Sequence, residues 1–141
     1  RLGAVMRYML DTNILVYVLN ARPRHEAVLE RFDGENPENL VVSSITLAEL
    51  RYGIEKSERR ESNRRALHRV LRALNVAAFD AKAAEVYGSV RATLKATGKP
   101  VGPLDTLIAA HALALDLTLV TSNLREFSRI RGLRVESWVT R

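Results

Sequence analysis

The sequence lacks several residue patterns on which whole classes of protein depend. It contains no cysteine, which excludes disulfide bridges, thiolate metal ligands and a cysteine nucleophile. Its longest apolar stretch, 5–19, is interrupted by Arg7, Asp11, Thr12 and Asn13, whereas a membrane-spanning helix needs roughly 20 mostly apolar residues. No leader with the pattern of a secretion signal precedes this stretch. We therefore expect a cytoplasmic protein that does not associate with membranes.

Three further kinds of site are missing. Gly98 and Gly102 do not have the spacing of a phosphate-binding loop, which also needs a following Lys-Ser or Lys-Thr. No serine stands in a nucleophile-elbow motif. The three histidines, His25, His68 and His111, are not spaced as zinc ligands, so we expect none of them to be catalytic.

The length and charge of the chain suggest one basic domain. A chain of 141 residues fits a single core, which usually occupies about 100 to 200 residues. We expect one domain over residues 6–141 and interpret residues 1–5, which precede Met6, as a remnant of cloning rather than native sequence. The 22 Lys and Arg exceed the 16 Asp and Glu, and the net charge of +6 favours a polyanionic partner.

Short apolar segments alternate with segments of helical periodicity. Strands are predicted at 5–10, 40–43, 75–79, 117–121 and 133–138, and helices at 14–20, 23–32, 44–53, 57–74, 80–94 and 104–115, with a loop at 33–39. This alternation predicts an α/β fold: a three-layer α/β/α domain around a central, mainly parallel sheet. In such sheets ligands bind at the carboxyl ends of the strands.

Three acidic residues follow predicted strands or open predicted helices. Asp11 comes after the first strand, Glu49 lies in the helix after the second, and Asp105 stands at the start of the helix 104–115. Each has a structural explanation by itself, because Asp11 and Asp105 suit helix caps and Thr46 with Glu49 suits a capping box. If the three converge on one crevice without nearby Lys or Arg, they instead need a cation, and oxygen ligands favour Mg²⁺ or Mn²⁺.

The order and spacing of four segments resemble a known family. The segments are MLDTN at 9–13, SSITLAELRYG at 43–53, PVGPLD at 100–105 and LVTSNLREF at 119–127. With them, the chain from Met6 onward resembles the PIN-domain ribonucleases, and within these the VapC-type toxins of bacterial toxin–antitoxin pairs. The resemblance implies a PIN-like fold in which Asp11, Glu49 and Asp105 form the catalytic, metal-binding pocket.

Several other residues are candidates to support this pocket. Thr12, Asn13 and Ser43 are placed to orient metal ligands or water, and the resemblance implies that the turn 121–123, with Thr121, closes the site. Many PIN domains carry a further acid at the position of Asn123. Here Asn123 is followed three residues later by Glu126, so the residue that serves the fourth position, and a second metal site, stay open.

The resemblance also implies an activity and partners. It implies a metal-dependent endoribonuclease that cleaves structured RNA, commonly tRNA, and so inhibits translation until a cognate VapB-type antitoxin occupies an apolar groove beside the acids. A homodimer is implied as well, or a higher assembly with the antitoxin. In the expected mechanism the metal polarises a phosphate oxygen and lowers the pKa of a water for in-line attack.

Two other functions are compatible with the sequence. A non-catalytic RNA- or protein-binding PIN module is suggested by Asn123, and a DNA-directed nuclease would use a similar acidic pocket, although the short chain argues against it.

Eight cationic residues form a region more typical of a solvated helix face: Arg51, Lys56, Arg59, Arg60, Arg64, Arg65, Arg69 and Arg72. Arg51 is nearest to the site in sequence and is the candidate RNA-binding residue.

Overall fold

The computed structural model describes residues 6–20 and 26–139. Three predictions lie outside the described residues: the nature of residues 1–5, the start of a helix at Pro23, and the absence of a role for His25. None of the helices in the described part of the chain is long and apolar enough to cross a membrane.

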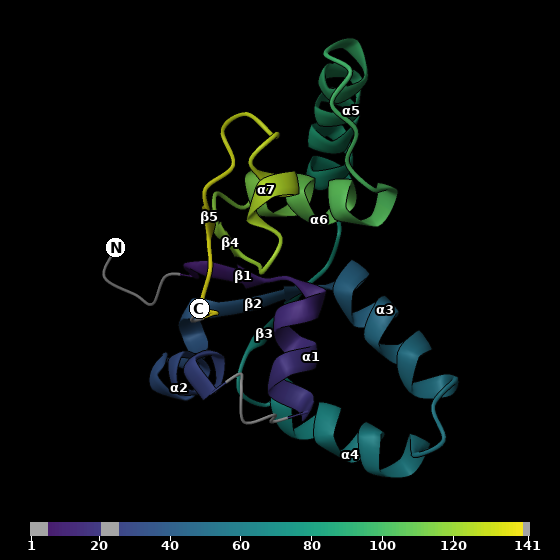
Figure 1. The fold of residues 1–141 in the computed structure, drawn as a ribbon, viewed down its shortest axis with the longest axis vertical. Helices are drawn as coiled ribbons and strands as arrows, with labels where there is room; N and C mark the ends of the chain where they lie inside the picture. The colour runs from purple at the N-terminus through teal and green to yellow at the C-terminus, as the bar shows by residue number, and fades with distance from the viewer. Residues whose placement is uncertain (1–5, 21–25, 140–141) are drawn as a thin grey trace.

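A five-stranded parallel sheet forms the centre of the molecule (Figure 1). Its strands are β1 (Tyr8–Leu10), β2 (Leu40–Ser43), β3 (Asn75–Ala77), β4 (Thr118–Val120) and β5 (Val135–Glu136). They lie in the order β3-β2-β1-β4-β5, and every neighbouring pair is parallel. Because all strands run the same way, the residues that follow β1, β2 and β4 lie at one edge of the sheet, the edge where ligands bind in open α/β folds.

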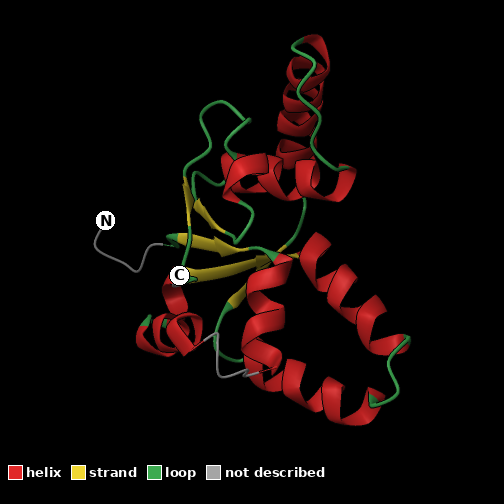
Figure 2. Cartoon of the chain, in the orientation of Figure 1, coloured by secondary structure: helices red, strands yellow, loops and turns green. Residues whose placement is uncertain are grey.

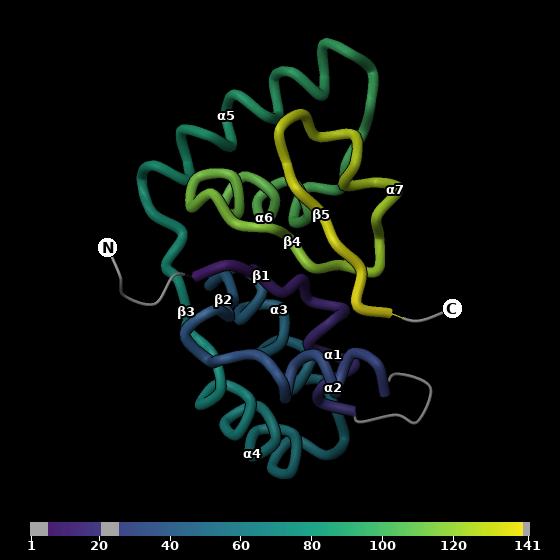
Figure 3. The backbone as a smooth tube through the Cα atoms, turned by 90° about the vertical axis from the view of Figure 1, so that its left-hand side faces the viewer, coloured from purple at the N-terminus to yellow at the C-terminus, as the bar shows by residue number. Residues whose placement is uncertain are grey.

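Helices cover both faces of the sheet, which confirms the predicted three-layer α/β/α class (Figures 1 and 2). One layer holds α1 (Thr12–Asn20), α2 (Glu26–Gly34), α3 (Ser44–Glu55) and α4 (Arg60–Leu71). The other holds α5 (Ala81–Ala96), α6 (Pro103–Ala114) and α7 (Leu124–Phe127). After a quarter turn the sheet again separates α5 and α6 from α1 to α4 (Figure 3).

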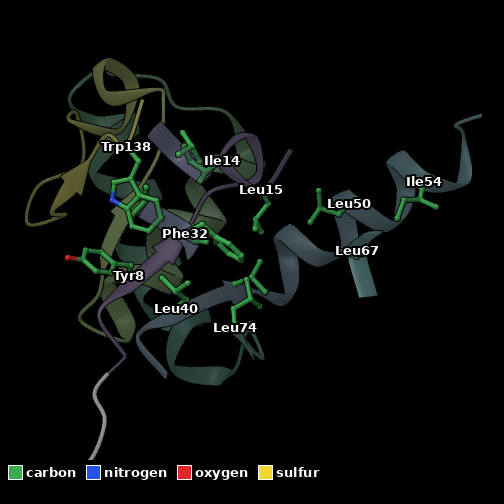
Figure 4. Packing of buried hydrophobic residues seen from close by; sticks show 14 residues of the cluster. Tyr8, Ile14, Leu15, Phe32, Leu40, Leu50, Ile54, Leu67, Leu74 and Trp138 are labelled. Carbon is green, nitrogen blue, oxygen red and sulfur yellow. The ribbon is translucent and has the colours of Figure 1, made fainter. Parts of the chain in front are cut away.

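Alternation along the strands divides the core into two clusters. Tyr8 and Leu10 pack against the layer of α1 to α4, while Met9 between them packs against α6 and α7. Figure 4 shows the first cluster, in which the rings of Tyr8 and Trp138 meet edge to face with their centroids 5.6 Å apart. The central strands β1 and β2 are buried at every position, whereas the edge strands β3 and β5 are partly exposed and carry the polar residues Asn75 and Glu136.

Some predicted boundaries were wrong. The segment 33–39 is not all loop, because α2 continues to Gly34 and a 3₁₀-helix, η2, spans Pro37–Asn39. The side chain of Asn36 caps η2 by accepting a hydrogen bond from the Glu38 amide. The helix expected from residue 57 begins at Arg60. The short helix α7 was not predicted at all, since four residues show no helical periodicity.

Two acidic residues outside the site have local structural roles. Asp80 caps α5, because its carboxylate accepts a hydrogen bond from the Ala83 amide at 3.0 Å. Asp116 lies in the turn between α6 and β4 with a φ of 58°, a left-handed conformation that Asp and Asn tolerate better than most residues. Glu85 lies within α5.

The burial of Phe127 gives a first prediction, on stability. Phe127 is fully buried on α7, whereas Leu124 on the same helix is 37% exposed. We expect Phe127→Ala to lower the free energy of unfolding by about 3 to 5 kcal/mol, because it leaves a cavity in the second core cluster. Leu124→Ala should lower it by less than about 1 kcal/mol. Urea unfolding measures both, and equal effects would contradict the packing of α7.

Candidate active site

Asp11 follows β1 directly and is held in one orientation. Its carboxylate accepts hydrogen bonds from the Thr12 amide at 2.8 Å and from the Thr121 hydroxyl at 2.8 Å. It is only 3% exposed. Burial raises the pKa of Asp11, and the charges of Glu49 and Glu126 raise it further, while the hydrogen bonds from Thr121 and Thr12 oppose the change.

Glu49 lies in the second turn of α3 and faces α1. The Thr12 hydroxyl donates to Glu49 Oε1 at 2.7 Å, so the residue that follows Asp11 also fixes Glu49. The predicted capping box was wrong: Ser43 is the N-cap of α3, through a hydrogen bond from the Ile45 amide at 3.0 Å. Glu49 instead accepts a hydrogen bond from Thr12 on α1, and not from a backbone amide at the start of α3 as a capping box requires.

Asp105 stands in the first turn of α6 and forms a hydrogen bond with Glu126. The N-cap of α6 is Gly102, so Asp105 is not the cap. Burial, the hydrogen bond with Glu126 and the charges of Asp11, Glu126 and Glu49 together raise the pKa of Asp105 to about 7. At neutral pH Asp105 is therefore partly protonated.

The turn after β4 orients Glu126. The Asn123 amide donates to the Thr121 hydroxyl at 2.9 Å, and the Asn123 side chain donates to Glu126 Oε1 at 3.0 Å. The Ser122 amide contacts Asn13 Oδ1 at 3.5 Å. The sequence left open whether Asn123 or Glu126 serves the position of the fourth acid. In the structure Glu126 contacts Asp105, and Asn123 contacts Glu126.

Ser43 and His111 form a buried link between the two helices that carry Glu49 and Asp105. His111 Nδ1 on α6 lies 2.8 Å from Ser43 Oγ at the N-terminus of α3. Both side chains are almost fully buried, and burial lowers the pKa of His111. Ser43 thus touches α3 and α6 rather than the carboxylates. The sequence analysis expected no catalytic role for His111 and did not detect this contact, because the two residues are 68 positions apart.

The carboxylates of Asp11, Glu49, Asp105 and Glu126 have no cationic partner among residues 6–20 and 26–139. None of them takes part in the ion pairs formed within the described residues. A set of oxygen donors with uncompensated charge suits a hard divalent cation such as Mg²⁺ or Mn²⁺. Within 6–20 and 26–139 no three acids or histidines form a ready-made ligand group, so the carboxylates would have to rotate toward a bound ion.

An apolar groove lies beside the acids, between α1, α3 and α4. Its volume is about 250 Å³, and Thr12 and Glu49 form part of its wall. The rest of the lining is mainly apolar: Val16, Leu19, Asn20, Leu50, Gly53, Ile54, Asn63 and Ala66. The groove is thus continuous with two residues of the acidic site.

Arg51 does not join the acids. It is exposed on α3, two residues after Glu49, and residues two apart on an α-helix point about 200° away from each other. Its neighbours are instead the arginines of α4, with which it lines a separate hollow. His68 lies in the same hollow, away from the carboxylates.

Comparison with known proteins identifies the family. The family model of the PIN domain matches residues 8–133. The chain belongs to the PIN-domain family. It is 45% identical over 135 residues to Ribonuclease VapC2 of Haemophilus influenzae, covering 96% of this chain and 100% of that protein. It is 42% identical over 134 residues to the tRNA(fMet)-specific endonuclease VapC of Shigella flexneri, covering 95% and 99%.

A solved structure agrees with the PIN-domain assignment. The described fold matches a chain in the crystal structure of DNA-bound VapBC from Salmonella typhimurium with a TM-score of 0.88 and 43% identity. The match covers 95% of this chain and 99% of that chain. The resemblance to VapC-type PIN domains is thereby confirmed over nearly the whole length.

The raised pKa of Asp105 makes stability depend on pH. The folded protein holds a proton on Asp105 up to about pH 7, whereas the unfolded chain releases it near the ordinary pKa of 3.8. This group therefore lowers the free energy of unfolding as the pH rises from about 4 to 7. We expect Glu126→Gln, which removes the partner carboxyl, to stabilise the metal-free protein at pH 8 and to have a smaller effect at pH 4.5.

Urea unfolding in EDTA at the two pH values measures this difference. Glu85→Gln, on the exposed side of α5, removes the same charge and should show no such pH dependence. A change in stability by Glu126→Gln that is identical at pH 4.5 and pH 8 would contradict the interaction between Asp105 and Glu126.

Proposed function

We propose that the chain is a metal-dependent endoribonuclease that cleaves structured RNA, with tRNA as its substrate, and that it acts as a toxin by inhibiting translation. The observation that carries the proposal is the acidic site: burial of Asp105, its hydrogen bond with Glu126 and the charges of Asp11, Glu126 and Glu49 raise the pKa of Asp105 to about 7. None of these carboxylates forms an ion pair within the described residues. Relatives with 45% and 42% identity are named as a ribonuclease and a tRNA(fMet)-specific endonuclease.

Some residues of the site would bind the metal, and others orient these ligands. Asp11, Glu49 and Asp105 would hold Mg²⁺ or Mn²⁺, with Glu126 completing the set. The bound ion supplies Lewis-acid polarisation of the phosphate and a more acidic water. Thr12 and Thr121 fix the carboxylates of Glu49 and Asp11 through hydrogen bonds of 2.7 and 2.8 Å.

Asp105, next to Glu126, would hold a proton until the site is loaded. Its partly protonated state near neutral pH keeps the repulsion within the empty cluster low. Asp105 would lose this proton if it became a metal ligand, so metal binding should release protons and become stronger as the pH rises. Asn123, through its bond to Glu126, keeps the second carboxylate aimed at Asp105.

Cleavage of a labelled tRNA pool by the purified protein tests the activity. We expect discrete products with Mg²⁺ or Mn²⁺ and none with EDTA. Asp11→Asn should lower the rate by at least about a hundredfold, since it removes a ligand charge but keeps the size of the side chain. Asp116→Asn is the matched control, because it makes the same change in an exposed turn where the left-handed backbone suits Asn.

Each failure has a distinct meaning. RNA that is bound but never cut under either metal would favour the non-catalytic PIN module. Cleavage of duplex DNA in preference to tRNA would favour the DNA-directed nuclease. Cleavage that survives Asp11→Asn would place the reaction outside the acidic site.

We further propose that the apolar groove between α1, α3 and α4 takes the tail of a VapB-type antitoxin. The groove contains Thr12 and Glu49, so a segment seated there would reach the catalytic acids, and its apolar lining suits the side chains of an amphipathic segment. A chain with a TM-score of 0.88 to this one comes from a VapBC complex. The homodimer, the assembly with antitoxin and the cytoplasmic location stay predictions.

A substitution in the groove tests the antitoxin proposal. Val16 lines the groove and is 37% exposed, so a charge there should weaken the complex without disturbing the core. On co-expression with a cognate VapB-type antitoxin, we expect the wild-type chain to co-purify with the antitoxin and Val16→Asp to lose it. Tyr52→Asp places the same charge on a 66% exposed residue outside the groove lining and should retain it. Loss with Tyr52→Asp alone would overturn the assignment.

A further inference from the structure

A second concave surface, between α3 and α4, is lined by five arginines and one histidine. Its volume is about 480 Å³, and no carboxylate or apolar residue forms its wall. We call it the arginine hollow; it consists of Arg51, Arg64, Arg65, His68, Arg69 and Arg72. Arginine is the side chain best suited to phosphate, because its planar guanidinium donates two parallel hydrogen bonds.

Most of the charge in the arginine hollow is not compensated. Arg64 is paired with Glu55 at 2.9 Å and with Glu61 at 3.2 Å, and Arg65 lies 3.9 Å from Glu61. In the part of the chain that the structure describes, Arg51, Arg69 and Arg72 have no carboxylate within 4.0 Å. Several guanidinium groups that share one concavity raise the local positive potential and attract an anion with several charges.

A purely structural explanation accounts for only part of this arrangement. Arg69 lies in the last turn of α4 and Arg72 is its C-cap, where a positive charge stabilises the helix dipole by about 0.3 to 1 kcal/mol. This effect does not explain Arg51, which belongs to α3 and contributes to the same hollow. A solvated helix face would spread its cations outward, whereas here two helices direct them into one concavity.

The hollow and the acidic site lie on different sides of the same helix. Glu49 and Arg51 are separated by about 200° around α3 but by only about 3 Å along its axis. An RNA that crosses α3 would therefore meet both. A short oligonucleotide bound only at the carboxylates would contact the acidic site but not the arginine hollow.

We propose that the arginine hollow is a second RNA-binding site, which holds the phosphodiester backbone of a structured substrate away from the bond that is cut. The proposal rests on the ribonuclease function argued above. RNA is favoured over an acidic protein segment because protein docking relies on apolar anchors, and the lining of the hollow has none. The apolar groove on the other side of α4 provides such anchors instead.

Salt-dependent binding of labelled tRNA tests the proposal. Fluorescence anisotropy in EDTA, where no cleavage is expected, gives the dissociation constant at a series of NaCl concentrations. We expect Arg69→Gln with Arg72→Gln to weaken binding and to reduce the slope of log K against log[NaCl] by about 2, since each lost phosphate contact removes about one counterion. Arg69→Lys with Arg72→Lys keeps the charge and should retain the slope.

A matched pair outside the hollow controls for net charge. Lys82→Gln with Arg131→Gln removes two exposed cations from the opposite helical layer and from the turn before β5. If this pair reduces the slope as much as the hollow pair does, the effect is one of overall charge and the proposal is overturned. Circular dichroism of every variant verifies that the fold is intact.

The remaining outcomes separate this proposal from the others. If the hollow pair weakens binding of poly-L-glutamate but not of tRNA, the hollow takes an acidic protein segment and the proposal is wrong. An unchanged slope for tRNA also overturns it. The absence of metal-dependent cleavage by the wild-type chain would instead count against the proposed function, because binding in EDTA does not depend on catalysis.

Discussion

Carboxylates at one edge of the sheet repel one another, and the surrounding structure has to hold them together against this repulsion. Asp11 follows β1, Glu49 and Asp105 lie on the helices that follow β2 and precede β4, and Glu126 follows β4. They are close enough that the charges of the other three contribute to a pKa of about 7 at Asp105. Without a cation this edge destabilises the folded state, and the excess negative charge is the property that a divalent metal can use.

The chain holds these carboxylates with neutral donors. Asp11 is held by an amide and by the Thr121 hydroxyl, Glu49 by the Thr12 hydroxyl, and Glu126 by the Asn123 amide group. Arginine or lysine would orient a carboxylate equally well but would neutralise it and lower its affinity for a cation. Neutral donors fix the geometry and leave the charge available, which is how a preorganised metal site differs from a structural ion pair.

The three principal acids could be predicted from the sequence because each depends on local features. A strand exit followed by Asp11, and helix starts near Glu49 and Asp105, already place these residues at one end of a parallel sheet. The contact between Asp105 and Glu126 could not be predicted in this way. It depends on α7, a four-residue helix without periodicity, and on packing between segments 21 positions apart.

Other errors also arose where tertiary contacts overrode local patterns. Thr46 and Glu49 have the spacing of a capping box, yet the hydroxyl of Thr12, 37 residues away, bonds to Glu49. The basic region was predicted as a solvated face because the periodicity of α4 accounts for its arginines. Only the structure shows that Arg51 from α3 turns toward the same concavity.

The two charged surfaces are therefore organised by a single helix. Glu49 on one side of α3 belongs to the acidic cluster, and Arg51 on the other side belongs to the arginine hollow. If cations such as Arg51 faced the acids, they would neutralise the cluster and compete with a metal ion. On the far side they leave the cluster uncompensated while the chain keeps its net charge of +6, which attracts a polyanion over longer distances. If the chain acts as proposed, separating the charges across one helix meets two opposing requirements of a metal-dependent nuclease: a negative site for the metal and a positive surface for its substrate.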